Sequence, residues 1–425
     1  MVHVPYQWKD KGEAAPIAQH SIAKHDILKA YLGDYLQTLV TSPHQEELRV
    51  TLVDGLAGGG AYAHEATRER VLGSPFVFLN TVRETEALIN LERQRPIRMD
   101  VDYIFVEKDR AVFELLTESL NQEGFGPRIG ADIQLIHSAF EDEAQFIQDF
   151  VAKKNPRVGR SLFLLDQYGY KDVPLPLIRT ILARLPASEV ILTFNVDSFI
   201  NFASDSKTTH KTLDQIGIPD VLRGRTIEDI KRSEKDFRLY IQSCMYQAIV
   251  SATGAQYYTV FFIRTAGHGD YWLVHLSQHH RARDVMTRVH WSKNNQFVHY
   301  GGAGIDMFQA LGYHAKHDHA SAGQGLLAFG FDDVATDASV GTLAEQLPRY
   351  IFARDEGIGF GELFARTCNS SPADSDRYKR ALQTLIEVKD IEVVSPTGGR
   401  HLKASTIRDA DLLLPSKQFT IFRSR

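Results

Sequence analysis

The stretch VDGLAGGG at residues 53–60 decides the fold of this chain. It continues the apolar run 48–53, which has the length and composition of a buried strand, and then becomes polar and rich in glycine. In open α/β sheets, ligands bind beyond the carboxyl ends of the strands, and glycines there let the backbone approach a ligand closely. We therefore expect an α/β domain with a ligand site at this turn.

Short apolar runs alternate with helical patterns on either side of this turn. The alternation predicts an α/β fold with a doubly wound, Rossmann-like parallel sheet. Two β-rich runs, 257–264 and 271–277, are separated by a short polar segment and predict a terminal antiparallel hairpin. The segment 195–235 is expected to be irregular. The other expected strands are 101–106, 133–136, 161–165 and 189–194, and the expected helices are 20–38, 110–120, 140–150, 175–185, 237–252 and 280–292, with one more opened by Gly73, Ser74 as its N-cap and Pro75.

The C-terminal part has a different pattern. Helical patterns at 343–353, 360–368 and 374–388 precede two β-rich segments, 391–395 and 400–404, which flank a tight turn. Three helices followed by a hairpin predict a winged helix-turn-helix. The expected domains are an N-terminal helical segment 1–45, the α/β domain 46–300, a linker or insertion 301–341 and the winged-helix domain 342–425.

Composition excludes several classes of protein. The 425 residues carry 48 Lys and Arg against 53 Asp and Glu, a net charge of -5, which is not the charge of a general nucleic-acid binder. The two cysteines, Cys244 and Cys368, lie far apart, which argues for a reducing compartment and against a zinc or iron–sulfur site of this chain alone. No apolar run reaches the roughly 18 residues of a membrane span, and the first residues lack a secretory apolar region. We expect a soluble, cytoplasmic protein with both cysteines buried.

An acidic residue, Glu107, ends the second strand of the sheet, where a carboxylate typically binds ribose hydroxyls. Glu107 follows the glycine-rich turn by far more residues than the roughly 20 that separate the two in a dinucleotide site, and the lysine of a P-loop is absent. An adenosine-type ligand fits best, and a methylsulfonium cofactor suits a site lined by carboxylates and free of phosphate-binding lysine. The alternative is a plain turn between strand and helix.

A second group of candidate residues follows the fourth strand. Asp166 can accept a hydrogen bond from a substrate amino or hydroxyl group, Tyr168 can stack on a planar base, and Gly169 lets the loop turn. The alternative is a capping aspartate beside a packed tyrosine. Asn195, after the fifth strand, is a weaker candidate and has a simple turn as its alternative.

Two basic stretches could contact nucleic acid. Arg281, Arg283 and Arg288 lie in a charged helix that is either a phosphate-contacting edge or a solvated face. Arg400 and Lys403 follow the turn of the expected wing, where phosphate contacts would lie. The expected recognition helix carries both acidic and basic side chains, so nucleic-acid contact and protein docking both stay open for this domain; these side chains are Asp374, Asp376, Arg377, Lys379, Arg380 and Gln383.

Histidines cluster in the expected linker. His314, His317 and His319 lie near Asp306 and Asp318, a composition that can bind metal. The surrounding small residues favour a loop with solvated histidines, and we predict no metal site.

Three stretches resemble a known family. Residues 24–32 are similar to a leading Lys-x-x-Ile-Leu-x-x-Tyr-Leu helix, and residues 53–60 with 73–75 to Asp-x-Phe-Ala-Gly-Pro-Gly followed by Gly-Ser-Pro. Residues 163–169 are similar to Phe-Leu-Asp-Pro-Tyr-Gly. The chain thus looks like a class I S-adenosylmethionine-dependent methyltransferase, and more narrowly it resembles the three-Cys-motif partner protein (TcmP) family.

The chain departs from this family pattern at three positions. Leu56 replaces phenylalanine, and Gly59 and Gln167 each replace proline. Because glutamine lacks the proline ring, we expect the backbone at residue 167 to be less constrained than in the family.

The resemblance implies S-adenosylmethionine as cofactor and assigns site residues. Asp54, Ala57, Gly58 and Gly60 would shape the methionine end, Glu107 would hold the ribose, Ser138, Ala139 and Phe140 would frame the adenine, and Asp166, Tyr168 and Gly169 would face the acceptor. The implied function is methyl transfer to nucleic acid, with a base amino group as one acceptor. The alternative is a binding module that targets a partner, a radical S-adenosylmethionine-type enzyme, to nucleic acid without its own turnover; any cysteine cluster would then belong to that partner.

Overall fold

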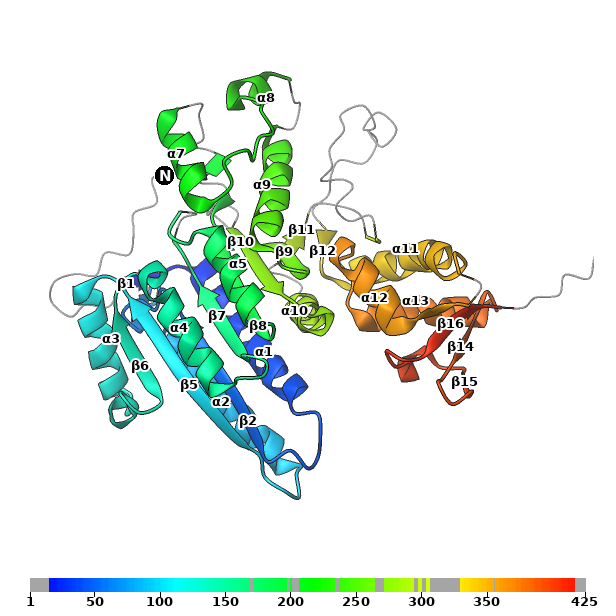
Figure 1. Cartoon of the computed structure of the whole chain (residues 1–425), viewed down its shortest axis with the longest axis horizontal. Coiled ribbons are helices and arrows are strands. Elements are labelled where there is room, and N and C mark those ends of the chain that lie inside the picture. The colour runs from blue at the N-terminus through cyan, green and yellow to red at the C-terminus, as the bar shows by residue number, and fades with distance from the viewer. Residues whose placement is uncertain are drawn as a thin grey trace, which may run out of the picture. The chain divides into compact units, whose positions relative to one another are not determined.

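The protein forms two compact units, Met1–Val289 and His290–Arg425, in the computed structural model of Figure 1. The structure describes residues 15–168, 171–196, 199–200, 206–233, 237–263, 271–293, 297–299, 303–305, 329–354 and 356–416. Gly169 and the expected linker histidines, His314, His317 and His319, lie outside these residues.

A mixed β-sheet organises the first unit. Its strand order there is β9-β10-β8-β7-β2-β5-β6, with β2, β5, β6, β7 and β8 parallel and β10 antiparallel to both β8 and β9. This order confirms the predicted doubly wound sheet with a terminal antiparallel hairpin. The strands are β2 (Glu47–Asp54), β5 (Arg98–Glu107), β6 (Ile133–His137), β7 (Ser161–Leu165), β8 (Ser188–Phe194), β9 (Tyr257–Ile263) and β10 (Tyr271–Ser277).

Helices cover both faces of this sheet, so the central strands are buried along their length. Every residue of β7 and β8 is buried, as expected for continuous apolar runs in a parallel sheet. In Figure 1, α4 and α5 lie in front of the sheet, while α1 packs against α2. The longer helices are α1 (Gln19–Leu39), α2 (Ser74–Leu91), α3 (Arg110–Gln122), α4 (Phe140–Lys154), α5 (Leu175–Arg184), α9 (Phe237–Thr253) and α10 (His280–Ser292), with a 3-10 turn η1 (Gly126–Arg128).

The strand order reverses at β2, which lies between β5 and β7. The chain proceeds from β2 to β5 and β6 on one side, and returns to β7 and β8 on the other. A crevice opens beyond the carboxyl ends of the strands at such a reversal. Asp54, Glu107 and Asp166 end or follow three neighbouring strands, so they share this edge of the sheet.

Two local predictions were wrong. The segment expected to be irregular contains α7 (Lys207–Ile216) and α8 (Ile227–Ser233). Helix α7 is mostly polar, with Leu213 and Ile216 buried, and is delimited by caps: Ser206 accepts from the Thr209 amide, and Gly217 is left-handed. Gly73, not Ser74, caps α2. A small sheet of β1 (Ala15–Ile17), β3 (Ala61–His64) and β4 (Arg70–Leu72) occupies the connection after the glycine-rich turn.

The second unit contains the predicted winged helix-turn-helix. Its first helix begins at Asp333, well before the expected residue 343, because the side chain of Asp332 caps it by accepting from the Ala335 amide. The sheet order is β13-β16-β14-β15, and β11 pairs with β12. The elements are β11 (Phe297–His299), β12 (Phe329–Gly330), α11 (Asp333–Ile351), β13 (Ile358–Gly359), α12 (Phe360–Thr367), η3 (Cys368–Ser370), α13 (Ser375–Glu387), β14 (Ile391–Val394), β15 (Arg400–His401), η4 (Ala404–Thr406) and β16 (Leu412–Pro415).

The described residues also bear on membranes, metals and thiols. None of their helices has the length and apolar content that a bilayer span requires. They contain no group of histidine, cysteine or carboxylate side chains arranged to bind a metal. Cys244 and Cys368 are free thiols, and both are buried, as predicted.

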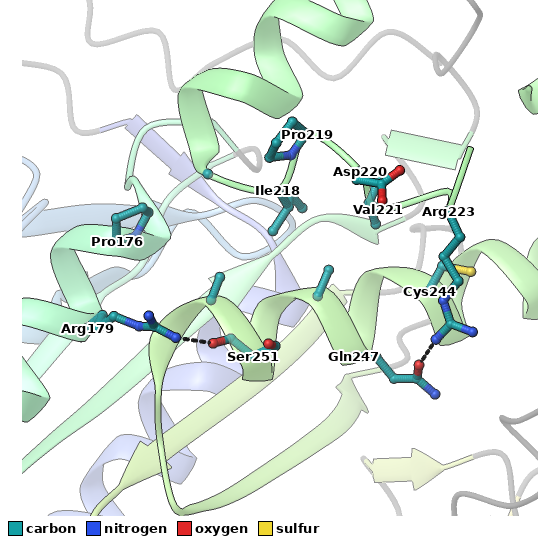
Figure 2. Close-up of a pocket in the computed structure, with 13 residues that line it drawn as sticks. Pro176, Arg179, Ile218, Pro219, Asp220, Val221, Arg223, Cys244, Gln247 and Ser251 are labelled. Carbon is teal, nitrogen blue, oxygen red and sulfur yellow. Dashed lines mark hydrogen bonds between the residues drawn. The ribbon is translucent and has the colours of Figure 1, made fainter. Parts of the chain in front are cut away.

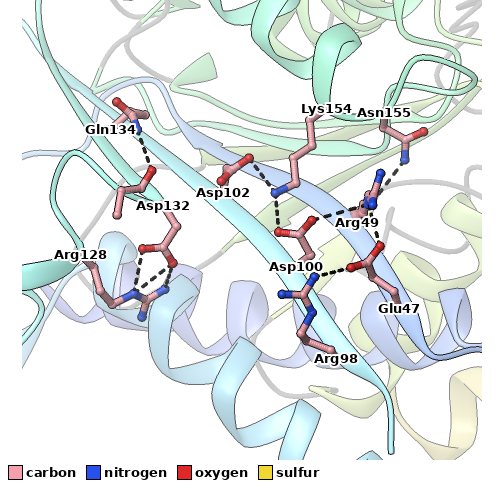
Figure 3. A network of polar contacts seen from close by, with 11 residues as sticks. Glu47, Arg49, Arg98, Asp100, Asp102, Arg128, Asp132, Gln134, Lys154 and Asn155 are labelled. Atoms are coloured by element: carbon pink, nitrogen blue, oxygen red, sulfur yellow. Dashed lines mark hydrogen bonds and ion pairs between the residues drawn. The ribbon is translucent and has the colours of Figure 1, made fainter.

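A network of ion pairs joins α4 to the amino ends of the strands (Figure 3). Lys154 is the last residue of α4, and its Nζ lies 2.9 Å from Asp100 Oδ1 and 2.6 Å from Asp102 Oδ2 on β5. Arg49 Nε, on β2, lies 2.7 Å from Glu47 Oε2. Because α4 begins at Phe140 on the opposite edge of the sheet, these ion pairs fix the direction of the helix that reaches the crevice.

We expect Lys154→Met to lower the free energy of unfolding by about 1–2 kcal/mol, because the side chain is only 11% exposed and its removal leaves Asp102 without its ion pair and Asp100 with Arg49 alone, 3.6 Å away. Urea denaturation measures the change. The matched control is Arg110→Met, which breaks the exposed pair with Glu114 and should leave stability unchanged. Equal losses in both variants would contradict the structural role of Lys154.

Candidate cofactor and acceptor site

The glycine-rich turn is held across the end of β5. Ala57 N donates to Val106 O at 2.9 Å, and Gly58 N donates to Glu107 Oε2 at 3.1 Å. Gly58 and Gly60 have φ of 63° and 78°, a left-handed conformation that favours glycine. The turn therefore places its backbone directly against the Glu107 carboxylate.

A cavity of about 550 Å³ opens at this edge of the sheet. Four of the predicted cofactor residues line it together: Glu107, Ser138, Ala139 and Phe140. The other four, Asp54, Ala57, Gly58 and Gly60, are not among its lining residues and belong to the turn behind it. The volume lies in the usual range for a small-molecule site. Gly55, Leu56, Lys108, Glu141, Lys171, Asp172, Pro174 and Gln215 complete the lining.

Two lysines accompany the carboxylates of this site, although neither belongs to a P-loop. Lys108 and Lys171 both line the cavity. Lys108 Nζ lies 3.5 Å from Asp172 Oδ1, so a carboxylate accompanies its charge. Glu107 and Glu141 balance the two cations further, and the cavity is therefore of mixed charge.

Gly55 is a further site residue that sequence reasoning missed. A Cβ atom at this position would lie 2.7 Å from Leu165 Cδ2 and 2.8 Å from Phe140 Cδ2. Glycine at this position therefore lets Phe140 pack against the strand ends. There the Phe140 ring also meets the Phe163 ring edge-to-face, with 6.4 Å between the ring centroids. Gly55 is one of the glycines of the turn 53–60, but the side chains that require a glycine at this position are distant in sequence.

The Glu107 carboxylate is positioned by backbone amides. Its Oε2 accepts from Gly58 N, and its Oε1 accepts from Asp109 N at 2.8 Å. Each carboxylate oxygen has a further lone pair, so Glu107 can still accept two hydrogen bonds from a ligand in the cavity. This geometry suits the two hydroxyls of a ribose.

Asp54 is fully buried at the end of β2. Its Oδ1 accepts from Leu56 N at 3.3 Å, while Oδ2 has no hydrogen-bond partner among the described residues. Burial raises the pKa of Asp54 to about 7, and the charges of Asp166 and Glu107 act in the same direction, partly offset by the Ser74 hydroxyl and the Leu56 amide. A buried oxygen without a hydrogen-bond partner is uncommon in a native protein, and here it lies in the turn behind the cavity.

Asp166 lies beyond the end of β7 and is bound by two side chains. Lys24 Nζ, from α1, lies 2.5 Å from Asp166 Oδ1, and Thr193 Oγ1 donates to the same oxygen at 2.6 Å. Burial acts to raise the pKa of Asp166, but the Lys24 charge and these hydrogen bonds hold it below its ordinary value. Asp166 is therefore an ionised acceptor whose Oδ2 has no hydrogen bond within the described protein.

Lys24 was not predicted as a site residue. It stands in the stretch 24–32, which carried the family resemblance, and its side chain is 11% exposed. Its neighbour His25 is held neutral, because burial lowers its pKa to about 4. A lysine on the face of a helix gives no sign of its partner when that partner is 142 residues away.

Gln167 makes three hydrogen bonds in the loop after β7. Its backbone N–H donates to Leu165 O at 3.0 Å, a hydrogen bond that proline cannot make. Its Oε1 accepts from Asp172 N at 3.0 Å and Val173 N at 3.3 Å. The side chain thus holds in place the loop that carries Asp172 to the cavity. Tyr168 follows it half-buried, and Asn195 is buried.

The predicted nucleic-acid contacts differ in exposure. Arg281 and Arg288 are exposed on α10, whereas Arg283 is 1% exposed and does not present its guanidinium at the surface. Arg400 and Lys403 are exposed on the wing, and Arg400 Nη2 lies 3.2 Å from Glu392 Oε2.

Two polar side chains of helix α13 are engaged inside the winged domain. Arg377 pairs with Asp374 at 2.8 Å and donates to Thr336 Oγ1 at 3.0 Å, while Gln383 Oε1 accepts from Ala404 N at 2.7 Å. These side chains stabilise the domain itself and do not form a free reading surface.

A different cavity, of about 600 Å³, lies between α5, α9 and the segment 217–223 (Figure 2). Its two arginines are already hydrogen-bonded: Arg179 donates to Ser251 O at 2.7 Å, and Arg223 donates to Gln247 Oε1. None of the predicted site residues lines it, and the strand-end cavity is the better candidate.

Comparison with known proteins identifies one domain. Residues 316–398 match the model of the GMT-like wHTH domain family, in agreement with the winged helix-turn-helix seen in the structure. No curated protein matches the sequence.

Solved structures resemble the chain only distantly. Protein LPL1258 from Legionella pneumophila str. Philadelphia 1 has 10% identity and a TM-score of 0.33 over 60% of this chain and 85% of its own. The bifunctional kinase-methyltransferase WbdD has 10% identity and a TM-score of 0.31, over 60% of this chain and 39% of its own. The METTL16 MTase domain has 9% identity and a TM-score of 0.27, over 58% of this chain and 66% of its own. The neighbours thus include methyltransferases, while the assignment of the fold rests on the strand order.

The pKa of Asp54 predicts a pH-dependent effect on stability. The pKa of Asp54 is about 7 in the folded protein and 3.8 in its ordinary state, so the unfolded chain loses the Asp54 proton first as the pH rises. Between these two pKa values, the free energy of unfolding falls by up to about 1.4 kcal/mol for each pH unit. Asp54→Asn should therefore gain stability relative to the wild type from about pH 4 to about pH 7, with a constant gain at higher pH.

Urea denaturation at several pH values measures this difference between variant and wild type. The exposed Asp26→Asn on α1 is the control and should show no such rise. A constant difference between the Asp54→Asn variant and wild type across the range would show that Asp54 is not a buried acid of raised pKa.

Proposed function

We propose that this protein is an S-adenosylmethionine-dependent methyltransferase that acts on nucleic acid. The observation that carries the proposal is the Glu107 carboxylate, held by two backbone amides at the end of β5 and facing a cavity that Phe140 also lines. This combination supports an adenosyl ligand, since a carboxylate binds ribose hydroxyls and an aromatic ring packs on a base.

The residues present fit the cofactor. Glu107 would accept from the ribose hydroxyls, Ser138, Ala139 and Phe140 would frame the adenine, and Asp54 would help to shape the methionine end from the turn behind the cavity. When bound, the cofactor supplies a methyl group activated by its sulfonium. Ala57, Gly58 and Gly60 shape the turn that holds these groups in place.

Asp166 would orient the acceptor. Lys24 and Thr193 share its Oδ1, and Oδ2 remains to accept a hydrogen bond from an amino or hydroxyl group, as on a base. Methyl transfer depends mainly on alignment and exclusion of water, so a fixed, ionised carboxylate supplies what the chain must contribute. Tyr168 would stack on the base, and Gly169 belongs to the same proposed loop.

The winged domain supports a nucleic-acid substrate. Proteins with this fold place basic wing residues against phosphates, and Arg400 and Lys403 are exposed on the wing. Arg281 and Arg288 on α10 would add phosphate contacts, whereas the burial of Arg283 counts against a contact there. A nucleic-acid-targeting module for a radical S-adenosylmethionine-type partner is the alternative.

We expect Glu107→Gln to weaken S-adenosylmethionine binding by at least about tenfold, because an amide cannot accept from ribose hydroxyls as a carboxylate does. Calorimetric titration of the full chain measures the dissociation constant. The exposed Glu118→Gln on α3 is the control and should bind as the wild type does. Equal affinities for the wild type and Glu107→Gln would overturn the site.

Turnover is tested by labelled methyl transfer to pools of DNA, RNA and protein. Labelling of DNA or RNA by the wild type and its loss in Asp166→Asn support the proposed reaction. Cofactor binding without labelling of any pool would instead favour the targeting module.

We expect Lys24→Met to raise the pKa of Asp166, since it removes the positive charge that lowers that pKa. The acidic limb of the pH–rate profile should move to higher pH, and kcat at neutral pH should fall by about tenfold through lost positioning. Lys29→Met, on the same helix and paired with Glu84 at the surface, is the matched control. A profile unchanged by Lys24→Met would remove Lys24 from the acceptor site.

A further inference from the structure

A separate cavity of about 540 Å³ lies at the opposite edge of the same sheet. Tyr35 on α1, Arg160 just before β7, Ser188 at the start of β8 and Arg281 on α10 are among its lining residues. Because parallel strands begin here and end at Glu107 and Asp166, this cavity is distinct from the proposed methyl-transfer site.

Two lining residues carry buried hydroxyls without partners. Tyr35 is 4% exposed and Ser188 is fully buried, and neither the Tyr35 hydroxyl nor Ser188 Oγ has a hydrogen-bond partner among the described residues. Buried polar groups in native proteins are nearly always hydrogen-bonded. Two such hydroxyls in one cavity indicate that its occupant is polar.

One cation in the lining of this cavity, Arg160, has no ion-pair partner among the described residues. The side chain of Arg160 is half-buried and makes no hydrogen bond or ion pair with the described protein. The two lining carboxylates are already engaged: Glu189 hydrogen-bonds with Tyr31 and His275, and Glu47 pairs with arginines on β2 and β5. Arg281 also lies in the lining. An anionic group would compensate this charge, and a guanidinium matches carboxylate and phosphate geometry.

We propose that this cavity binds a small organic anion bearing a phosphate or carboxylate group. Arg160 would hold the anionic group, and the hydroxyls of Tyr35 and Ser188 would hydrogen-bond to it or to its polar neighbours. A small ligand fits best, because the cavity holds about 540 Å³ and both hydroxyls are buried. The lining also includes apolar side chains that suit its carbon skeleton, namely Leu39, Pro186, Ala187 and Val285.

Calorimetric titration of the full chain with inorganic phosphate and with succinate tests the site. We expect at least one probe to bind, and Arg160→Ala to weaken its binding by about tenfold or more, as for the loss of a charge-assisted hydrogen bond. Arg157→Ala is the matched control, because Arg157 is exposed in the same loop and does not line the cavity. Glu107→Gln should leave probe binding unchanged, which separates this site from the cofactor site.

Tyr35→Phe provides a second variant, which keeps the ring packing and removes only the hydroxyl. It should weaken binding of the probe severalfold, and it keeps the test decisive even if Arg160→Ala fails to fold. Binding of phosphate alone identifies a phosphate-bearing ligand, and binding of succinate alone a carboxylate. The proposal is wrong if neither probe binds, or if both variants bind as the wild type does. Displacement of the bound probe by a single-stranded oligonucleotide would instead assign the cavity to nucleic-acid phosphate.

Discussion

Three carboxylates share one edge of the sheet, and their mutual repulsion is the constraint around which the candidate site is built. Asp54, Glu107 and Asp166 end or follow β2, β5 and β7, which are adjacent strands. Each meets the constraint differently: burial raises the pKa of Asp54 to about 7, backbone amides bind Glu107, and the Lys24 ammonium accompanies Asp166. Three residues of one chemical kind thereby acquire three roles: a buried acid, a hydrogen-bond acceptor and an ionised anchor.

The support for this edge comes from contacts some distance from it. Helix α4 begins with Phe140 at the cavity and ends with Lys154, which is paired to β5 at the other edge of the sheet. Gln167 holds the loop after β7 through two backbone amides. Contacts of this kind hold the site residues in place from a distance, so that the site can align a ligand without rearranging.

The sequence was sufficient to predict the sheet but not all of the site. Apolar runs and the turn 53–60 are local patterns, and they predicted the strands, the terminal hairpin and the acidic strand ends. The roles of Lys24, Gly55 and Gln167 arise from neighbours that the fold brings together, and no local pattern announces them. Helix α7 was missed for a related reason: its polar sequence conceals a helix that Ser206 and Gly217 delimit. The predicted roles of Tyr168 and Gly169 stay predictions.

The winged domain limits how the chain can meet nucleic acid. Arg377 and Gln383 of α13 are engaged within the domain, and the acidic Asp376 and Glu387 are exposed on the same helix, so α13 offers little unopposed positive charge. Arg400 and Lys403 stand on the wing instead, where phosphate contacts are independent of base sequence. If this domain binds nucleic acid, it therefore positions the strand through contacts with the phosphates of the nucleic acid. Recognition of a particular base then falls to the acceptor site around Asp166.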